Sequence, residues 1–330
     1  MKKIFTSLIF IFAANIFALN CKICKKEING RYIKDNKNNA FCSEKCFAET
    51  APKCNLCKKA CIKAVYTFQE KTYCSKTCLE QTSKCANCTK PAMPARIIIN
   101  AEGSKMQFCL PCAELPKCYF CSFPLKTKTL NDGIIICSIC RKNAVISKEQ
   151  IFSRMKYIRR KLKQMYGFDM NHHIEIIPVD RNELEKESRE IYQAVNGFKI
   201  ALMRYNYEIS EKRSSKGRKT KKLQNEKCRI FVLKNTPKDL LDDALAHELA
   251  HDFLRHNAGM ISELSVEEGF AETIAAQFNK AEKKPHLNKR KEINNDPVYG
   301  GGYKKISAIF KTKGFKKTVE YVKTFAKPVI

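Results

Sequence analysis

The sequence is poor in acidic residues and in histidine, and it has a single long apolar run. Asp and Glu total 33 against 62 Lys and Arg, so the net charge is +29 and the surface favours anionic partners. Hydrophobic residues make up 44% of the chain, which excludes a wholly disordered protein. Six histidines stand beside eighteen cysteines, so the state of these thiols is the first question. The length of 330 residues favours two or three domains.

The apolar run lies at the N-terminus, where residues 4–17 follow Lys2 and Lys3. It is too short for a transmembrane helix and is typical of an export signal. We therefore expect residues 1–20 to be a signal peptide and the protein to be periplasmic or secreted, with no transmembrane anchor after signal removal. A cytoplasmic location is the alternative if these residues are not a signal. A lipoprotein with acylated Cys21 is a further one, and Cys21 would then bind no metal.

Sixteen of the cysteines form four repeated boxes, which begin at residues 21, 54, 85 and 118. In each box a close cysteine pair is followed, 15 to 20 residues later, by a second pair. This spacing lets two tight turns present four thiolates to one zinc ion. The predicted ligands are Cys21, Cys24, Cys42 and Cys46; Cys54, Cys57, Cys74 and Cys78; Cys85, Cys88, Cys109 and Cys112; and Cys118, Cys121, Cys137 and Cys140.

A disulfide framework is the alternative for these boxes, since an exported protein can form one. A disulfide framework does not require two close cysteine pairs in each of the four boxes, whereas four-cysteine zinc sites do. We therefore expect about four structural zinc ions. Such small units depend on metal for their folding energy. The third cysteine of each box follows an apolar residue, which predicts a hairpin strand whose last side chain covers the metal. Cys61 and Cys228 fall outside the scheme and are expected to be ordinary thiols.

The cysteine array resembles LIM domains, in which two zinc modules follow each other closely along the chain. It departs from them in its linkers of 7, 6 and 5 residues and in having only cysteine ligands. The resemblance implies that residues 21–140 form four tandem LIM-like zinc ribbons that hold a protein partner.

A second domain is expected over residues 148–330, where only one cysteine remains. Its predicted elements are helices over 148–168, 181–196 and 262–278, strands over 174–179, 200–209 and 228–233, and a long helix that begins near Thr236. Thr236, Pro237 and Asp239 are expected to supply the cap, the first-turn proline and the capping-box acid of that helix. The strand over 228–233 is expected to bind an extended substrate by strand addition.

The long helix carries His247 and His251 four residues apart, so both imidazoles lie on one face and can bind one metal ion. Glu248 is placed to accept a proton from a metal-bound water. The alternative is a solvated helix face with two incidental histidines.

The third ligand is expected from the helix over 262–278, and Glu268 is the candidate. Glu272, one turn on, is expected to accept the second ring proton of His247. The competing interpretation pairs Ser265 with Glu268 in a capping box. Glu267 is expected to point away from the metal.

An oxyanion-stabilising donor is also expected beside such a site, because charge develops on the substrate oxygen during hydrolysis. Tyr299 is the first candidate for this catalytic role, and Tyr303 and His256 are its rivals.

These residues bring the second domain into resemblance with a peptidase family. The relevant segments are Ala246-His247-Glu248-Leu249-Ala250-His251, Val266-Glu267-Glu268-Gly269 and Asp296-Pro297-Val298-Tyr299-Gly300. Together they look like the peptidase domain of the LIM-containing DA-one family, which limits organ growth in plants and has bacterial relatives. The resemblance implies an α+β zincin-like fold, a gluzincin-type site with one catalytic zinc, and peptide-bond hydrolysis. Nothing in the chain resembles the ubiquitin-interacting helices of the plant proteins.

The sequence thus predicts a zinc metallopeptidase whose ribbons recognise a protein substrate or partner. The alternative is an adaptor or nucleic-acid-binding protein with a silent peptidase-like domain. The segment 212–222 carries seven Lys or Arg, but no stacking aromatics interleave with them, so a solvated loop is the preferred interpretation over nucleic-acid binding.

Overall fold

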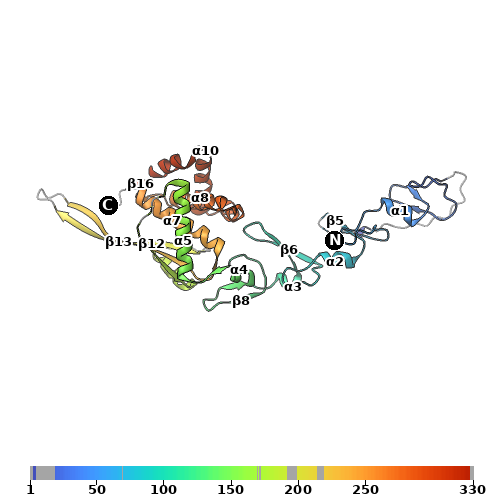
Figure 1. The fold of residues 1–330 in the computed structure, drawn as a ribbon, viewed down its shortest axis with the longest axis horizontal. Coiled ribbons are helices and arrows are strands. Elements are labelled where there is room, and N and C mark those ends of the chain that lie inside the picture. The colour runs from blue at the N-terminus through green and yellow to red at the C-terminus, as the bar shows by residue number, and fades with distance from the viewer. Residues whose placement is uncertain are drawn as a thin grey trace. The chain divides into compact units, whose positions relative to one another are not determined.

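The computed structural model describes residues 3–4, 19–68, 70–168, 170, 172–191, 199–213 and 219–327. They form two compact units with mixed helices and strands, Met1–Ile98 with Met106–Leu115 and Ile99–Lys105 with Pro116–Ile330. Figure 1 shows the elements of each unit. Most of the predicted signal peptide lies outside the described residues, and Lys3–Ile4 form β1, which pairs with β4 (Val65–Phe68). No helix of the described residues is long and apolar enough to cross a membrane.

The four cysteine boxes share one local architecture of a tight turn, a hairpin and a short helix. The elements are, in order, β2 (Ile33–Lys34), β3 (Ala40–Phe41) and α1 (Glu44–Thr50); β4 (Val65–Phe68), β5 (Lys71–Tyr73) and α2 (Lys76–Thr82); β6 (Ala95–Ile99), β7 (Lys105–Cys109) and α3 (Leu110–Ala113); β8 (Thr127–Thr129), β9 (Ile135–Cys137) and α4 (Ser138–Lys142). The predicted hairpins are confirmed.

The turn of each box has the same unusual backbone conformation. The residue after the second cysteine is left-handed, with φ of 60° to 62° at Lys25, Lys58, Thr89 and Ser122. The apolar side chain before the third cysteine is buried in every box, as predicted. These side chains are Phe41, Tyr73, Phe108 and Ile136.

The second unit contains a three-stranded sheet in the order β11–β13–β12, formed by β11 (Ile174–Val179), β13 (Lys219–Leu233) and β12 (Ala201–Arg213). β11 is parallel to β13 and β12 is antiparallel to it. The prediction that strand 228–233 accepts a substrate strand is therefore wrong, because β11 and β12 already pair with its two edges.

The two longer strands also extend into the segment that was expected to be a basic loop. β12 and β13 pair through Arg213 and Lys219, and residues 214–218 lie outside the described part of the chain. Figure 1 shows this hairpin projecting away from the helices of its unit.

Helices cover both faces of the sheet because alternate residues of β13 are buried on opposite sides. Ile230 and Val232 join the core of α5 (Lys148–Tyr166) and α7 (Lys238–Asn257). Phe231 and Leu233 are also buried, and α6 (Arg181–Ile191) packs against β12 and β13.

The start of α7 differs from the expectation. Pro237 is the N-cap residue and makes no side-chain cap, while the Thr236 hydroxyl donates to the Leu233 carbonyl instead. Residues Thr236–Pro237 form β14, which pairs with β10 (Ala144–Val145) directly after α4. The Lys238 amide then donates to the Asn143 carbonyl at 2.9 Å. The predicted side-chain cap is therefore absent. The first amide of α7 is instead satisfied by a backbone carbonyl next to the fourth cysteine box.

The helix after α7 is α8 (Leu264–Ala281), and the apolar residues that its sequence spaces four apart, Val266, Phe270, Ile274 and Phe278, are fully buried. The capping-box alternative for Glu268 is wrong, because the Ser265 hydroxyl donates to Glu263 and the helix has no side-chain cap.

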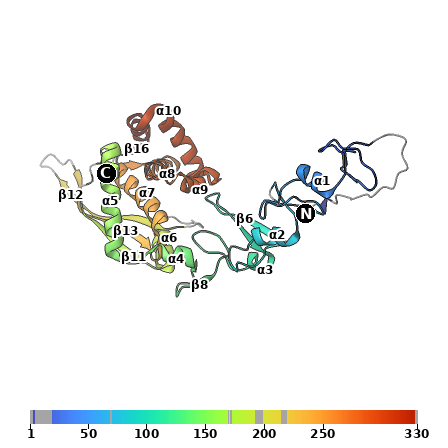
Figure 2. The same cartoon turned by 45° about the vertical axis from the view of Figure 1, so that its right-hand side comes forward.

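The C-terminal elements are α9 (Lys289–Ile293), η2 (Pro297–Gly301) and α10 (Gly302–Lys323), with α10 beside α8 in Figure 2. Gly302 makes this close approach possible, since a Cβ there would lie 2.1 Å from the Ser265 carbonyl oxygen. The contact fixes η2, and with it Tyr299, against α8.

Candidate metal centres

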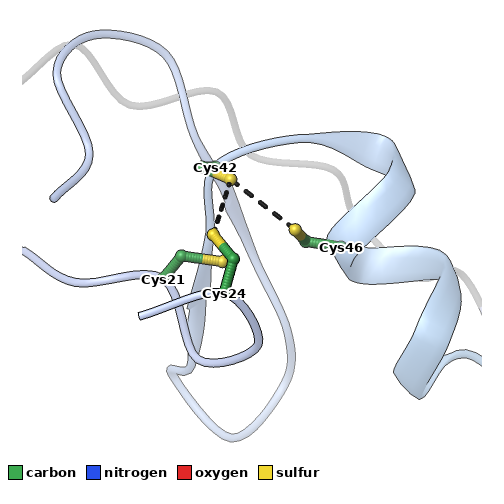
Figure 3. Close-up of side chains that lie close together, drawn as sticks. All are labelled: Cys21, Cys24, Cys42 and Cys46. Carbon is green, nitrogen blue, oxygen red and sulfur yellow. Dashed lines mark hydrogen bonds between the residues drawn. The ribbon is translucent and has the colours of Figure 1, made fainter. Parts of the chain in front are cut away.

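Four cysteine side chains converge in each box, and Figure 3 shows the first set. The second pair always comes from the end of the hairpin and the short helix, as Cys42 and Cys46 show. The measured Sγ–Sγ distances are 3.6 Å for Cys24–Cys42, 3.7 Å for Cys42–Cys46, 3.5 Å for Cys57–Cys74, 3.6 Å for Cys74–Cys78, 3.8 Å for Cys88–Cys109 and 3.8 Å for Cys121–Cys137.

These distances distinguish the two expectations for the boxes. A disulfide needs sulfurs about 2.05 Å apart. Four sulfurs placed tetrahedrally about 2.3 Å from a zinc ion lie about 3.8 Å from one another. The observed values match the second arrangement, and all eighteen cysteines are free thiols. The boxes are therefore four-cysteine groups arranged to bind zinc.

Backbone amides prepare the first cysteine of a box to act as a thiolate ligand. Burial of Cys21 disfavours its charge, yet the N–H groups of Cys42 and Cys24 outweigh burial and lower its pKa to about 6. Cys54 and Cys85 have pKa values lowered to about 6 in the same way. Since only thiolates bind zinc, these turns favour the metal-binding form of the first cysteine of each of these boxes.

The two thiols outside the boxes are both buried. Cys61 packs in the core of the second box, and burial raises its pKa. Cys228 lies on β13, where burial raises the pKa of its thiol.

A different ligand set lies between α7 and α8. The Nε2 atoms of His247 and His251 are 3.0 Å apart, and Glu268 Oε2 lies 3.2 Å and 3.5 Å from them respectively. Ligands placed tetrahedrally about 2.0 to 2.1 Å from zinc lie about 3.3 to 3.4 Å from one another. The three predicted ligand atoms therefore have a spacing that suits a zinc ion, with one position left open.

Each imidazole of this group also faces a carboxylate on α8 through its other nitrogen. His247 Nδ1 lies 3.8 Å from Glu272 Oε1, and His251 Nδ1 lies 3.3 Å from Glu267 Oε1. Buried Lys291 of α9 hydrogen-bonds Glu272 and lies 3.0 Å from Asp243 Oδ2.

Glu248 is buried beside the histidines, and one of its oxygens is held by the sheet. The Met203 amide of β12 donates to Glu248 Oε2 at 2.8 Å. Burial raises the pKa of Glu248, although the two neighbouring histidines act in the opposite direction. Burial also works against the charge of Glu268, but His251 and His247 hold its pKa well below the usual range.

The three candidate oxyanion donors occupy different surroundings. Tyr299 is half-buried on η2, and burial together with the charges of Glu268 and Glu248 raises its pKa. Tyr303 is buried on α10, where burial and Glu292 raise its pKa. His256 contacts Asp252 and stacks on His172, and it belongs to a separate cluster.

Three residues contribute to this site in ways that the sequence did not predict. Glu267 was expected to point away from the metal, yet its carboxylate reaches the second ligand histidine, His251. Lys291 and Met203 come from distant elements, and their sequence neighbours carry no signal of the contact. The adjacent acids Glu267 and Glu268 could have predicted the role of Glu267. Each ligand histidine has a second ring nitrogen that needs a hydrogen-bond acceptor, and a carboxylate next to the third ligand is well placed to be one.

No protein-family model matches the chain. Among curated proteins, the chain is similar to Four and a half LIM domains protein 5 of Bos taurus, with 27% identity over 150 residues, 42% of this chain and 49% of that protein. The chain thus spans about half the length of the curated relative it matches. Together with the four clusters of cysteine ligands, this similarity supports tandem LIM-like zinc-binding modules. The peptidase family stays a prediction.

Proposed function

We propose that this chain binds a partner protein through its LIM-like modules and hydrolyses peptide bonds at the site between α7 and α8. The first activity is supported by the four-cysteine groups and by the similarity to a protein named for its LIM domains. Closed tetrathiolate sites leave no open position for chemistry, so such modules serve as rigid binding surfaces.

One observation carries the proposed hydrolysis: three ligand atoms of His247, His251 and Glu268 lie 3.0 to 3.5 Å apart beside the buried carboxylate of Glu248. Two imidazoles and one carboxylate with an open position are the donor set of hydrolytic zinc sites. A zinc ion bound there would lower the pKa of a water molecule and polarise a peptide carbonyl.

The residues of the chain supply the remaining steps. Glu248 accepts the proton of the attacking water and passes it to the leaving amine, and burial favours its protonated form between these events. Tyr299 is the proposed hydrogen-bond donor to the oxyanion, because η2, which carries it, packs against α8, which carries Glu268.

The strand that offers room for an extended substrate is β12 rather than β13. β12 pairs with β13 along one edge, and among the described residues no strand pairs with its other edge. The Met203 amide on β12 donates to Glu248, so this strand lies next to the proposed general base. A substrate strand added to β12 would therefore run past the site.

The second candidate is an adaptor with a silent α7–α8 site, and the similarity to a protein named for its LIM domains favours it. A role in nucleic-acid binding rests only on the net charge of +29. The presence of Glu248 favours hydrolysis, since metal binding alone does not require it.

The experiment incubates the full chain, and its Glu248→Gln variant, with a mixture of denatured proteins and identifies new peptide termini by mass spectrometry. Glutamine keeps an acceptor for the Met203 amide but cannot take a proton, so cleavage should be lost while zinc content and folding persist. Cleavage by neither protein would support the adaptor, and equal cleavage by both would refute the role of Glu248.

A further inference from the structure

A second group of potential metal ligands lies in the same unit and takes no part in the site of His247, His251 and Glu268. It consists of His172, which precedes β11, and of Asp252 and His256 near the end of α7. One ligand atom from each of these three side chains lies within 4.8 Å of the others.

Asp252 forms the base of this group, and its side chain is 0% exposed. Its Oδ1 atom lies 2.9 Å from His172 Nε2 and accepts a hydrogen bond from the Tyr205 hydroxyl at 3.2 Å. Its Oδ2 atom is buried and has no hydrogen-bond partner among the described residues. A buried carboxylate with one oxygen unpartnered is unfavourable, and a cation bound through the other oxygen, Oδ1, would offset this cost by neutralising the charge of the whole group.

The two histidines close over the carboxylate and remain open to solvent on their outer edges. Their rings stack with centroids 4.2 Å apart, and their side chains are 30% and 32% exposed. His256 Nδ1 lies 3.4 Å from Asp252 Oδ1. Ligand atoms about 2.1 Å from a metal lie about 3.0 Å apart at a right angle and about 3.4 Å apart in a tetrahedron, so both contacts with Oδ1 suit a shared ion.

We propose that His172, Asp252 and His256 form a second binding site for a divalent transition metal ion such as Zn²⁺. Two imidazoles with one carboxylate favour such an ion over Mg²⁺ or Ca²⁺, which prefer oxygen ligands throughout. The buried thiol of Cys228, 3.9 Å from Asp252 Oδ1, adds a soft donor nearby. His256 Nδ1 also lies 2.9 Å from the Asp252 carbonyl oxygen, so metal binding must replace that hydrogen bond.

The competing explanation is that the two histidines only hydrogen-bond Asp252 and bind no metal. The substitution His172→Gln distinguishes this explanation from a metal site. Glutamine keeps an N–H donor for Asp252 but is a poor ligand for a transition metal. The adjacent His173, which is exposed, provides the matched control. Full-length proteins are equilibrated with excess Zn²⁺, passed over a desalting column and analysed for bound metal.

His172→Gln should lose one zinc equivalent per chain, and His173→Gln should lose none. Equal zinc content in His172→Gln and wild type would overturn the proposal. If His172→Gln fails to fold, histidine modification of the wild type gives the answer: Zn²⁺ should protect His172 and His256, and not His173, from diethyl pyrocarbonate. Unchanged modification of His172 would refute the site. The test measures bound metal and not peptide cleavage, so its result does not depend on the proposed hydrolysis. Glu268→Ala should remove a different zinc equivalent, the one at the α7–α8 site.

Discussion

Glu267 Oε1 lies 3.3 Å from His251 Nδ1, so the carboxylate next to the proposed ligand Glu268 faces a ligand histidine. Glu272 stands in a similar relation to His247, at 3.8 Å. Glu267 can thus accept the second ring proton of His251, which fixes the tautomer and leaves Nε2 for the metal. The distance between Glu272 and His247, in contrast, is that of an ion pair rather than a hydrogen bond. Both carboxylates come from α8, which also supplies Glu268.

Removal of Glu267 should therefore weaken metal binding. We expect Glu267→Ala to lower the zinc affinity of the α7–α8 site by roughly 10 to 100-fold, as is typical when a partner of a ligand histidine is lost. Glu320→Ala is the control, because Glu320 is exposed and pairs with Lys317 on α10. Competition with a zinc chelator measures both, and equal affinities in the two variants would show that Glu267 does not orient His251.

The fourth cysteine box should stabilise the second unit. β10 pairs with β14, and the Asn143 carbonyl accepts from the amide that starts α7. The sequence predicted a second domain that begins at residue 148, whereas the compact unit includes Ile99–Lys105 and the residues from Pro116 onward.

Two fragments test this dependence. A fragment over residues 116–330 should melt at a higher temperature than one over residues 148–330. The shorter fragment loses several hydrogen bonds, each contributing about 1 kcal/mol, and 1 kcal/mol corresponds to about 2 to 4 °C at this size. Calorimetry of zinc-loaded fragments gives the comparison, and equal melting temperatures would mean that the fourth box contributes no stability to this unit.

The close contact of α8 with α10 depends on glycine at one position and not at its neighbour. A Cβ at Gly302 would meet the Ser265 carbonyl oxygen at 2.1 Å, whereas a Cβ at Gly301 has its nearest contact at 3.7 Å. Gly302→Ala should therefore destabilise the protein by about 1 to 3 kcal/mol. Gly301→Ala, at a helical backbone position, should be neutral or slightly stabilising. Denaturant unfolding measures both, and an equal effect of the two substitutions would contradict the packing described.

Local patterns predicted the elements whose residues interact close in sequence. β11 has the bounds expected from its run of β-branched residues, and the apolar stripe of α8 is buried as its four-residue spacing required. The ligand residues of the four-cysteine groups followed from repeated spacing in the same way.

Long-range contacts account for what the sequence did not predict. Thr236 carries a good capping side chain, but Ala144 and Val145, about ninety residues earlier, pair with residues 236–237 and form a strand there. Lys291 reaches Glu272 from another helix, and its position among surface-like lysines and acids gave no sign of burial. Such contacts are set by packing of whole elements, which residue periodicity does not encode.

Anomalous scattering at the zinc absorption edge, from crystals of the full chain, locates any zinc ion held by His247, His251 and Glu268. We expect a peak about 2 Å from His247 Nε2, His251 Nε2 and Glu268 Oε2, in addition to one peak in each four-cysteine group. The peaks in the cysteine groups serve as the internal control for zinc loading. Peaks in every four-cysteine group with none between α7 and α8 would show that these three residues do not bind zinc.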